Sequence, residues 1–387
     1  MKRTLSVFLA VALVLSMTLI GNTSVFASQS GDLTYTVSNS TATITGYTGV
    51  GGDVTIPAEL GGCPVTSIGY GAFSECSDLT SITIPSSVTS IGTGAFGGCT
   101  GLTSITIPSS VTSIGYSAFY DCTGLTQIIV DDNNLDYSSQ DGVLFNKTKT
   151  ILICCPGGKT GSYTIPSSVT NIESVAFVAC FVLTSITIPS SVMSIGNYAF
   201  YGCGLTSITI PSSVTSIGDG AFCGCGFTSI TIPSSVTSIG DGVFWGCFGL
   251  TSITIPSSVT SIGNYAFDGC IRLTSITIPS SVTSIGYDAF CGCIKLTKIT
   301  FPTSVKNIGN QAFWGCEKLT TANFLGNVPK IGDDVFARCG SKFTIYYIKG
   351  KTGFSNPWHG YKAMYKGQIL VKSVKLNKSN MHMTLTF

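Results

Sequence analysis

Hydrophobic and polar positions recur with a fixed period along most of this 387-residue chain. In the stretch "LTSITIPSSVTSIGTGAFGGC" (residues 79–99), Leu79, Ile82 and Ile84 are hydrophobic, and polar Ser81 and Thr83 alternate with the two isoleucines. This alternation predicts a short strand with one buried face and one exposed face. Proline has no amide hydrogen to continue a ladder, so we expect the strand to stop at "P" after the second isoleucine.

The second half of the unit predicts two further inward-facing segments. Val88 and Ile91 are expected to face the interior, and Gly92 suits a turn. The segments "TGAF", "NYAF", "DGAF" and "YDAF" predict short helical turns, with phenylalanine and a cysteine three residues later pointing inward. The residues expected to supply a capping oxygen to these turns are Thr93, Asn197, Asp219, Asp241 and Asn264.

The unit returns every 22 or 23 residues, apart from one longer step between Phe119 and Phe177. A single unit cannot bury its inner row, whereas stacked units bury it between neighbours. The sequence therefore predicts a mainly β solenoid of about 11–12 stacked coils that form a parallel sheet with short helical turns. The expected structural ladder of phenylalanine and cysteine includes Phe96, Cys99, Phe119, Cys122, Phe200, Cys203, Phe222, Cys225, Phe244, Cys247, Phe267 and Cys270.

The pattern "LTSITIPSSVTSIGxxAFxGC" resembles the BspA-type leucine-rich repeat, from Leu33 to about Tyr361. The resemblance implies a leucine-rich-repeat solenoid and a secreted or cell-surface protein, since members of this family are typically exported and some act as adhesins. The sequence departs from the family pattern in two places. Glu173 stands where the repeat has glycine, and Cys154 and Cys155 add cysteines to the longer step.

The ends of the chain and the longer step predict the domain organisation. Residues 1–27 read as a secretory signal peptide, with Lys2 and Arg3 ahead of a hydrophobic run. Residues 28–62 are expected to form an N-terminal capping hairpin, and residues 63–345 the solenoid, with an irregular unit at 123–163 that contains the hairpin "GVLFNKTKTILI". Residues 346–370 are expected to cap the other end with Trp358 and Tyr361, and residues 371–387 resemble a linker or the first strand of a bacterial Ig-like module.

Charge is sparse and unevenly distributed. Only 10% of residues are charged, and residues 28–334 contain 9 Lys and Arg against 18 Asp and Glu, a balance of −9. Residues 335–387 contain nine basic side chains and no acidic one. A basic end is typical of contact with an anionic surface, so an anionic cell-wall polymer is a candidate partner, with a solvated lysine-rich end as the alternative.

Sixteen cysteines in an exported chain normally suggest disulfides. Eleven of them, however, follow phenylalanine at a spacing set by the repeat, and buried free cysteine packs as a small hydrophobe. We therefore expect reduced ladder thiols, and we expect Cys223 and Cys291 to face outward. No metal site is predicted, because "CGC" is not a zinc-ligand spacing and no histidine is near. Residues 131–141 could supply oxygen ligands for calcium, although solvated turn residues are the preferred interpretation.

The sequence predicts no enzyme and no cofactor. Its only histidines, His359 and His382, lie near the C-terminus, and the many serines have no base at a recurring position. The adjacent pairs Asp131–Asp132 and Asp333–Asp334 point apart in an extended segment. No nucleic-acid partner is predicted, and no transmembrane helix remains once the signal peptide is removed.

The predicted function is therefore adhesion, or binding of proteins or glycans on a host or neighbouring cell, through an extended face. The outward strand positions expected to line a concave binding face are Ser81, Thr83, Ser104, Thr106, Ser185, Thr187, Ser207, Thr209, Ser229, Thr231, Ser252, Thr254, Ser275 and Thr277. Two alternatives remain open: a structural spacer that displays a C-terminal module, and an ice-binding threonine array. If one distinguished site exists, the irregular segment between Val130 and Tyr163 is the predicted place.

Overall fold

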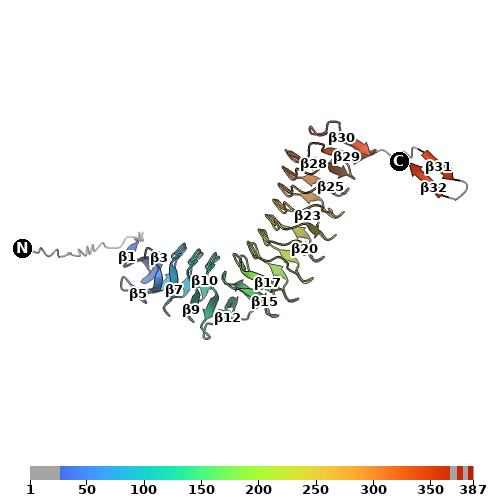
Figure 1. Ribbon diagram of the computed structural model, residues 1–387. Coiled ribbons are helices and arrows are strands. Elements are labelled where there is room, and N and C mark those ends of the chain that lie inside the picture. The colour runs from blue at the N-terminus through green and yellow to red at the C-terminus, as the bar shows by residue number, and fades with distance from the viewer. Residues whose placement is uncertain (1–26, 367–372, 378–381, 387) are drawn as a thin grey trace, which may run out of the picture.

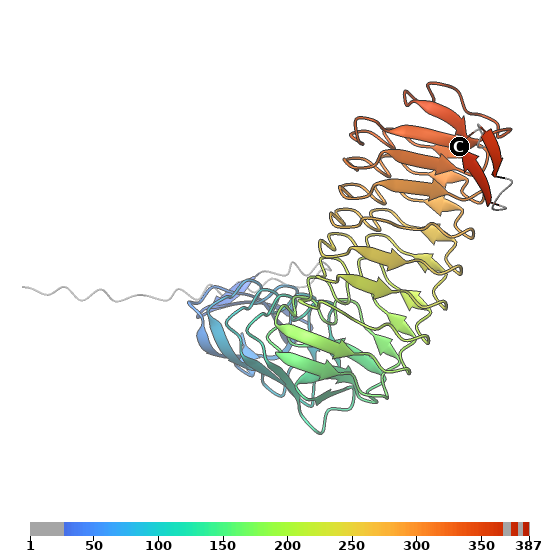
Figure 2. The same ribbon diagram turned by 45° about the vertical axis from the view of Figure 1, so that its right-hand side comes forward.

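The structure is a computed structural model that describes residues 27–366, 373–377 and 382–386. It is a curved rod of stacked coils in which each coil adds one layer, so residues one repeat apart lie side by side (Figures 1 and 2). This confirms the predicted mainly β solenoid. The predicted signal peptide lies outside the described residues.

The "LTSITIP" segments form the first strand row, which runs along the rod on one side. Its strands pair in parallel, as in β9 with β11, where Ile105 is opposite Ile128. The row is broken into short sheets, because several coils contribute a bridge or no strand. Its members are β4 (Gly52–Thr55), β7 (Leu79–Thr83), β9 (Ser104–Ile107), β11 (Gln127–Val130), β15 (Gly161–Thr164), β17 (Leu183–Thr187), β20 (Ser229–Thr231), β22 (Ser252–Thr254), β25 (Lys298–Phe301), β27 (Thr321–Phe324), β29 (Thr344–Ile348) and β30 (Ala363–Lys366).

The "SVTSIG" segments form a second strand row of very short parallel strands. Ser90 and Ile91 pair with Ser113 and Ile114 in the next coil, and the same register continues along the rod. The isoleucine faces the interior in each pair. The members are β6 (Cys63–Ile68), β8 (Ser90–Ile91), β10 (Ser113–Ile114), β16 (Asn171–Ile172), β18 (Ser194–Ile195), β19 (Ser216–Ile217), β21 (Ser238–Ile239), β23 (Ser261–Ile262), β24 (Ser284–Ile285), β26 (Asn307–Ile308) and β28 (Lys330–Ile331).

The segments that lead into phenylalanine are not the short helical turns that the sequence predicted. Alternate amides of each turn donate to the neighbouring coil, as the Phe96 amide does to the Ala118 carbonyl over 2.9 Å. Gly94 and Gly98 both have positive φ, which a right-handed helix does not allow. These turns therefore form a third, non-helical row along the rod, which we call the turn row. No helix occurs in the described residues.

Both ends of the rod are closed by their own residues. At the N-terminus, β1 (Ser28–Ser30), β2 (Leu33–Ser38) and β3 (Thr41–Tyr47) pair antiparallel, and β3 then pairs in parallel with β6, so the predicted hairpin covers the first coil. The two-residue β5 (Glu59–Leu60) pairs with β6. At the C-terminal end Trp358 is buried against Phe324, with ring centroids 5.4 Å apart.

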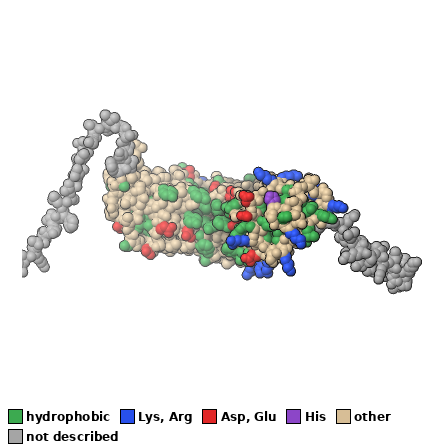
Figure 3. Space-filling view, turned by 90° about the horizontal axis from the view of Figure 1, so that it is seen from above, with side chains coloured by type: hydrophobic (Ala, Val, Ile, Leu, Met, Phe, Trp, Pro, Cys, Tyr) green, Lys and Arg blue, Asp and Glu red, His purple; other side chains and the backbone are tan. Residues whose placement is uncertain are grey.

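Exposed basic side chains gather near the C-terminal end of the rod (Figure 3). Lys342, Lys349 and Lys362 are among them. Beyond the rod, β31 (Ser373–Asn377) and β32 (His382–Thr386) form an antiparallel pair. The expected Ig-like module stays a prediction.

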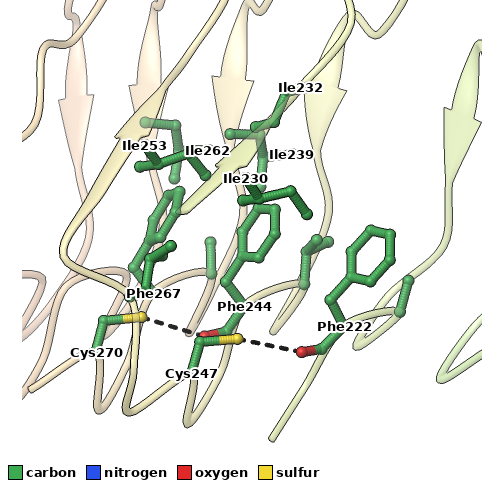
Figure 4. Close-up of a cluster of buried hydrophobic side chains, with 14 of the residues drawn as sticks. Phe222, Ile230, Ile232, Ile239, Phe244, Cys247, Ile253, Ile262, Phe267 and Cys270 are labelled. Carbon is green, nitrogen blue, oxygen red and sulfur yellow. Dashed lines mark hydrogen bonds between the residues drawn. The ribbon is translucent and has the colours of Figure 1, made fainter. Parts of the chain in front are cut away.

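The interior contains the predicted ladder as two phenylalanine stacks, Phe73 to Phe119 and Phe177 to Phe336, on either side of the irregular unit. The rings of Phe222, Phe244 and Phe267 are fully buried and stack with centroids 5.8 and 5.3 Å apart (Figure 4). Isoleucines from the two strand rows pack against the rings on the side opposite the cysteines. Burial of a side chain of this size stabilises the fold by about 1.5–3 kcal/mol, so each coil depends on its neighbours for stability.

The irregular unit replaces the regular coils between Phe119 and Phe177. Its strands β12 (Tyr137–Gln140), β13 (Val143–Asn146) and β14 (Ile151–Cys154) pair antiparallel, which includes the hairpin predicted from "GVLFNKTKTILI". Strand β14 then pairs in parallel with β16, so the second strand row resumes after the interruption.

Candidate functional site

The predicted binding residues of the first strand row, which we call the Ser/Thr row, all carry at least partly exposed side chains. The inward neighbours Ile230 and Ile253 are buried, whereas Thr231 and Thr254 are exposed and lie in register in adjacent coils. The hydroxyl of Ser81 is already bound, because it donates to the Asp53 carboxylate over 2.7 Å. The other serines and threonines of the row present hydroxyl and methyl groups to solvent at each coil.

A hollow interrupts the Ser/Thr row between the coils of β22 and β25. It has a volume of about 570 Å³ and is lined by Ser275, Thr277, Thr300 and Lys298, among others. Ser275 makes only a single bridge to Ser252, so the coil around it has no regular strand. The row is thus a grooved surface, not one flat threonine array.

Of the residues expected to cap helical turns, Asn197, Asp219, Asp241 and Asn264 bind the next coil instead. The Oδ1 atom of Asp219 accepts a hydrogen bond from the backbone amide of Asp241 over 2.8 Å, and Oδ1 of Asp241 accepts one from the amide of Asn264 over 2.7 Å. Because the turns are not helical, the backbone amides of Asp241 and Asn264 bind a side chain of the preceding coil and not one of their own turn. The acidic and amide side chains therefore tie coils together along the edge of the turn row.

All sixteen cysteines lie in the described part of the chain, and all are free. Most ladder thiols donate to the phenylalanine carbonyl of the preceding coil, as Cys122 does to Phe96 over 3.0 Å. Burial raises the pKa of Cys122 to about 12. Cys223 was expected to face outward but is buried, since its neighbours at the same position in the turn row are the larger Tyr201 and Trp245.

No group of histidine, cysteine and acidic side chains in residues 27–366 or the two short C-terminal segments is arranged to hold a metal ion. In the suggested calcium segment, the Asp131 carboxylate accepts the amide hydrogen of Asn133, which is an ordinary turn contact. Asn134, which the sequence did not single out, fixes this segment to the rod. It is fully buried, and its side-chain amide donates to the carbonyls of Pro108 and Val111.

The interruption leaves a cavity in the turn row. The regular turn of Phe119 has no following turn to bind, because the irregular unit supplies Cys155 at that level, whose amide donates to Ala176 over 2.7 Å. The resulting cavity has a volume of about 330 Å³. Its lining includes Tyr116, Tyr120, Tyr137, Ile151, Ile153, Cys154, Glu173, Val175 and Val178.

Exposed aromatic side chains continue from this cavity along the turn row. A second hollow of about 330 Å³ shares Tyr116 and Tyr120 with the cavity and extends to Tyr198, Tyr201 and Trp245. Trp245 is 48% exposed. Hydrophobic side chains gather across the middle of the molecule in the view from above, with acidic side chains beside them (Figure 3). We call Tyr116, Tyr120, Tyr198, Tyr201 and Trp245 the aromatic patch. A contiguous exposed hydrophobic surface is typical of an interaction site.

Sequence reasoning missed the aromatic patch. Its residues occupy three different positions of the repeat, two before the phenylalanine and one directly after it, and several other coils have Thr, Asp or Gly there. The usable signal was Glu173, the one residue that replaces the glycine of "SIG". It lies in the cavity lining next to the patch.

The family described as "BspA type Leucine rich repeat region" matches at residues 66–156, 154–247 and 215–342. No curated protein matches the chain. No helix among the described residues combines the length and hydrophobicity needed to span a bilayer.

Several crystal structures are similar along nearly the whole rod. A leucine-rich cell surface protein from Faecalibacterium prausnitzii is 31% identical, covers 83% of this chain and 94% of its own, and superposes with a TM-score of 0.54. A leucine-rich repeat protein from Bacteroides ovatus is 26% identical over 88% of this chain and 100% of its own, with a TM-score of 0.51. One from Eubacterium ventriosum is 26% identical over 86% and 97%, with a TM-score of 0.52.

Proposed function

This chain belongs to the BspA-type leucine-rich repeat family, and on that premise we propose that it is a non-catalytic scaffold that mediates adhesion at a cell surface or after secretion. Its partners are proteins or glycans of a host or neighbouring cell. The surface location is supported by the cell surface protein of Faecalibacterium prausnitzii, to which 83% of the chain is similar.

The observation that carries this proposal is the exposed Ser/Thr row. Equivalent hydroxyl groups recur from one coil to the next, as those of Thr231 and Thr254 do on paired strands. A partner with its own repeated groups gains avidity from many weak contacts on such a surface. The hollow at Ser275 and Thr277 adds a place where a side chain or sugar ring fits between coils.

The basic C-terminal end has a separate role in the proposal. Lys342, Lys349 and Lys362 are exposed there, whereas the preceding body has a balance of −9 charges. We propose that this end contacts an anionic cell-wall polymer, which fits a protein held at a surface.

The test adds charge to the middle of the Ser/Thr row and compares adhesion. The triple variant is Thr209→Lys, Thr231→Lys and Thr254→Lys, and the matched control is Ser212→Lys, Ser234→Lys and Ser257→Lys, at exposed positions of the same three coils. Binding to immobilised fibronectin, to mucin and to epithelial cells is measured at equal folded concentration. We expect adhesion to fall about tenfold or more in the row variant only. Equal adhesion of both variants and the parent chain contradicts binding through this row and favours a spacer.

A further inference from the structure

The cavity at the interruption contains the only departure from the glycine of the "SIG" turn. In the flanking coils a side chain at this position would clash with the backbone of the preceding coil. A Cβ on Gly115 would lie 2.3 Å from the Thr93 amide nitrogen, and one on Gly196 would lie 2.4 Å from that of Ser174. Glu173 occurs in the coil that follows the missing turn, where no such backbone blocks it. The interruption therefore creates both the cavity and the room for a carboxylate in its wall.

The remaining walls are aromatic and aliphatic. Tyr116 and Tyr120 lie at the mouth and are 54% and 40% exposed. Tyr137 lies deeper, and its hydroxyl accepts the amide hydrogen of Ile114 over 2.9 Å. Ile151 and other aliphatic side chains cover much of the rest. The cavity thus combines aromatic faces, a hydrophobic wall and one carboxylate.

The charge of this carboxylate is not neutralised within the rod. Glu173 accepts a hydrogen bond at Oε1 from the side-chain amide of Asn171 over 3.3 Å, which brings no positive charge. No lysine, arginine or histidine of the described residues lines the cavity. The surrounding body is acidic overall, so the field at the mouth favours a cation.

We propose that this cavity binds the basic side chain, lysine or arginine, of a partner protein. Such a side chain has a methylene stem that packs against the aliphatic wall, and a cationic head that pairs with Glu173 and lies over tyrosine faces. A sugar fits less well, because the lining offers few convergent polar groups for its hydroxyls. This inference rests on the proposed function, since it names the partner chemistry of one site on the same scaffold.

The experiment uses the full chain and three blocked tripeptides, Ac-Gly-Lys-Gly-NH2, Ac-Gly-Arg-Gly-NH2 and Ac-Gly-Nle-Gly-NH2, in which norleucine keeps the hydrophobic stem without the charge. Binding is followed by NMR of the tyrosine ring signals at low and high salt. We expect both basic peptides to bind at least about fivefold more tightly than the norleucine peptide, with the difference reduced by salt. Equal binding of all three peptides, or no binding, overturns the proposal, and so does preferential binding of maltose or N-acetylglucosamine in the same assay.

Variants separate this site from the rest of the scaffold. Glu173→Gln and Tyr116→Ala are expected to remove the preference for basic peptides, and Asp131→Asn, which changes an exposed carboxylate of the adjoining irregular unit, is the matched control. Thermal melts verify that each variant is folded. If Glu173→Gln keeps the preference, the inference is wrong, whereas adhesion through the Ser/Thr row is tested independently by the lysine variants above.

Discussion

The thiol of Cys247 donates a hydrogen bond to the backbone carbonyl of Phe222, one coil earlier, over 3.2 Å (Figure 4). The same contact joins Cys270 to Phe244 over 3.3 Å. The ladder thiol is therefore a donor to a buried carbonyl as well as a small hydrophobe. A disulfide at this position would remove the donor, so these contacts between coils require reduced thiols.

This contact predicts a loss of stability in alkali. Burial raises the pKa of Cys247 to about 12 from a usual value of 9.0. Because the unfolded chain releases its thiol protons first as the pH rises, the stabilisation is complete below pH 9 and is lost between pH 9 and about 12. Melting temperatures measured from pH 8 to pH 11 are expected to fall less steeply for Cys247→Ala than for the parent chain. Parallel curves for the two proteins contradict the assignment.

The phenylalanine stack predicts a large effect from one truncation in the middle of the rod. Phe244 is fully buried between Phe222 and Phe267, so Phe244→Ala is expected to destabilise the fold by about 3–5 kcal/mol. Ser257→Ala, at an exposed position of the following turn, is the control and is expected to change stability by less than about 0.5 kcal/mol. Calorimetry measures the loss, and hydrogen exchange locates it. Uniform exchange along the rod, with no opening near the substituted coil, would argue against nearest-neighbour stacking.

The carboxylates along the turn row predict a difference between removing and replacing an acceptor. Asp241 accepts the amide hydrogen of Asn264, so Asp241→Ala leaves that amide without its partner and is expected to lower stability by about 1 kcal/mol. Asp241→Asn keeps an oxygen in place, as Asn197 does for Asp219, and is expected to stay near the parent value. Urea unfolding distinguishes the two. A similar loss in both variants would mean that charge, not the hydrogen bond, matters here.

The glycine of the "SIG" turn predicts opposite tolerance at two equivalent positions. A Cβ on Gly286 would lie 2.5 Å from the backbone nitrogen of Asn264, so Gly286→Ala is expected to cost about 1–3 kcal/mol. Glu173→Ala removes an existing side chain next to a cavity and is expected to change stability by less than about 1 kcal/mol. Thermal melts of the two variants check this. A harmless Gly286→Ala would contradict the close approach of the coils.

The sequence alone determined the architecture. A repeat of 22 or 23 residues with Ile at strand positions and Phe and Cys in the turn leaves one way to bury every apolar row, which is to stack the coils. The N-terminal hairpin around Ser38–Thr41 and the C-terminal cap at Trp358 followed because the first and last coils would otherwise expose that interior. Periodic burial is a local property repeated many times, so pattern was sufficient.

The tertiary structure decided three features that the pattern could not. The turns are not helical, because their amides bind the neighbouring coil. For the same reason Oδ1 of Asp219 accepts the amide hydrogen of Asp241 in the next coil. The aromatic patch exists because side chains from separate coils meet where the turn row is interrupted. Glu173 was visible in the sequence as an exception, but its role as the carboxylate of a cavity depends on a missing neighbour one coil away. Contacts between coils set each of these features, and one repeat read along the chain does not contain them.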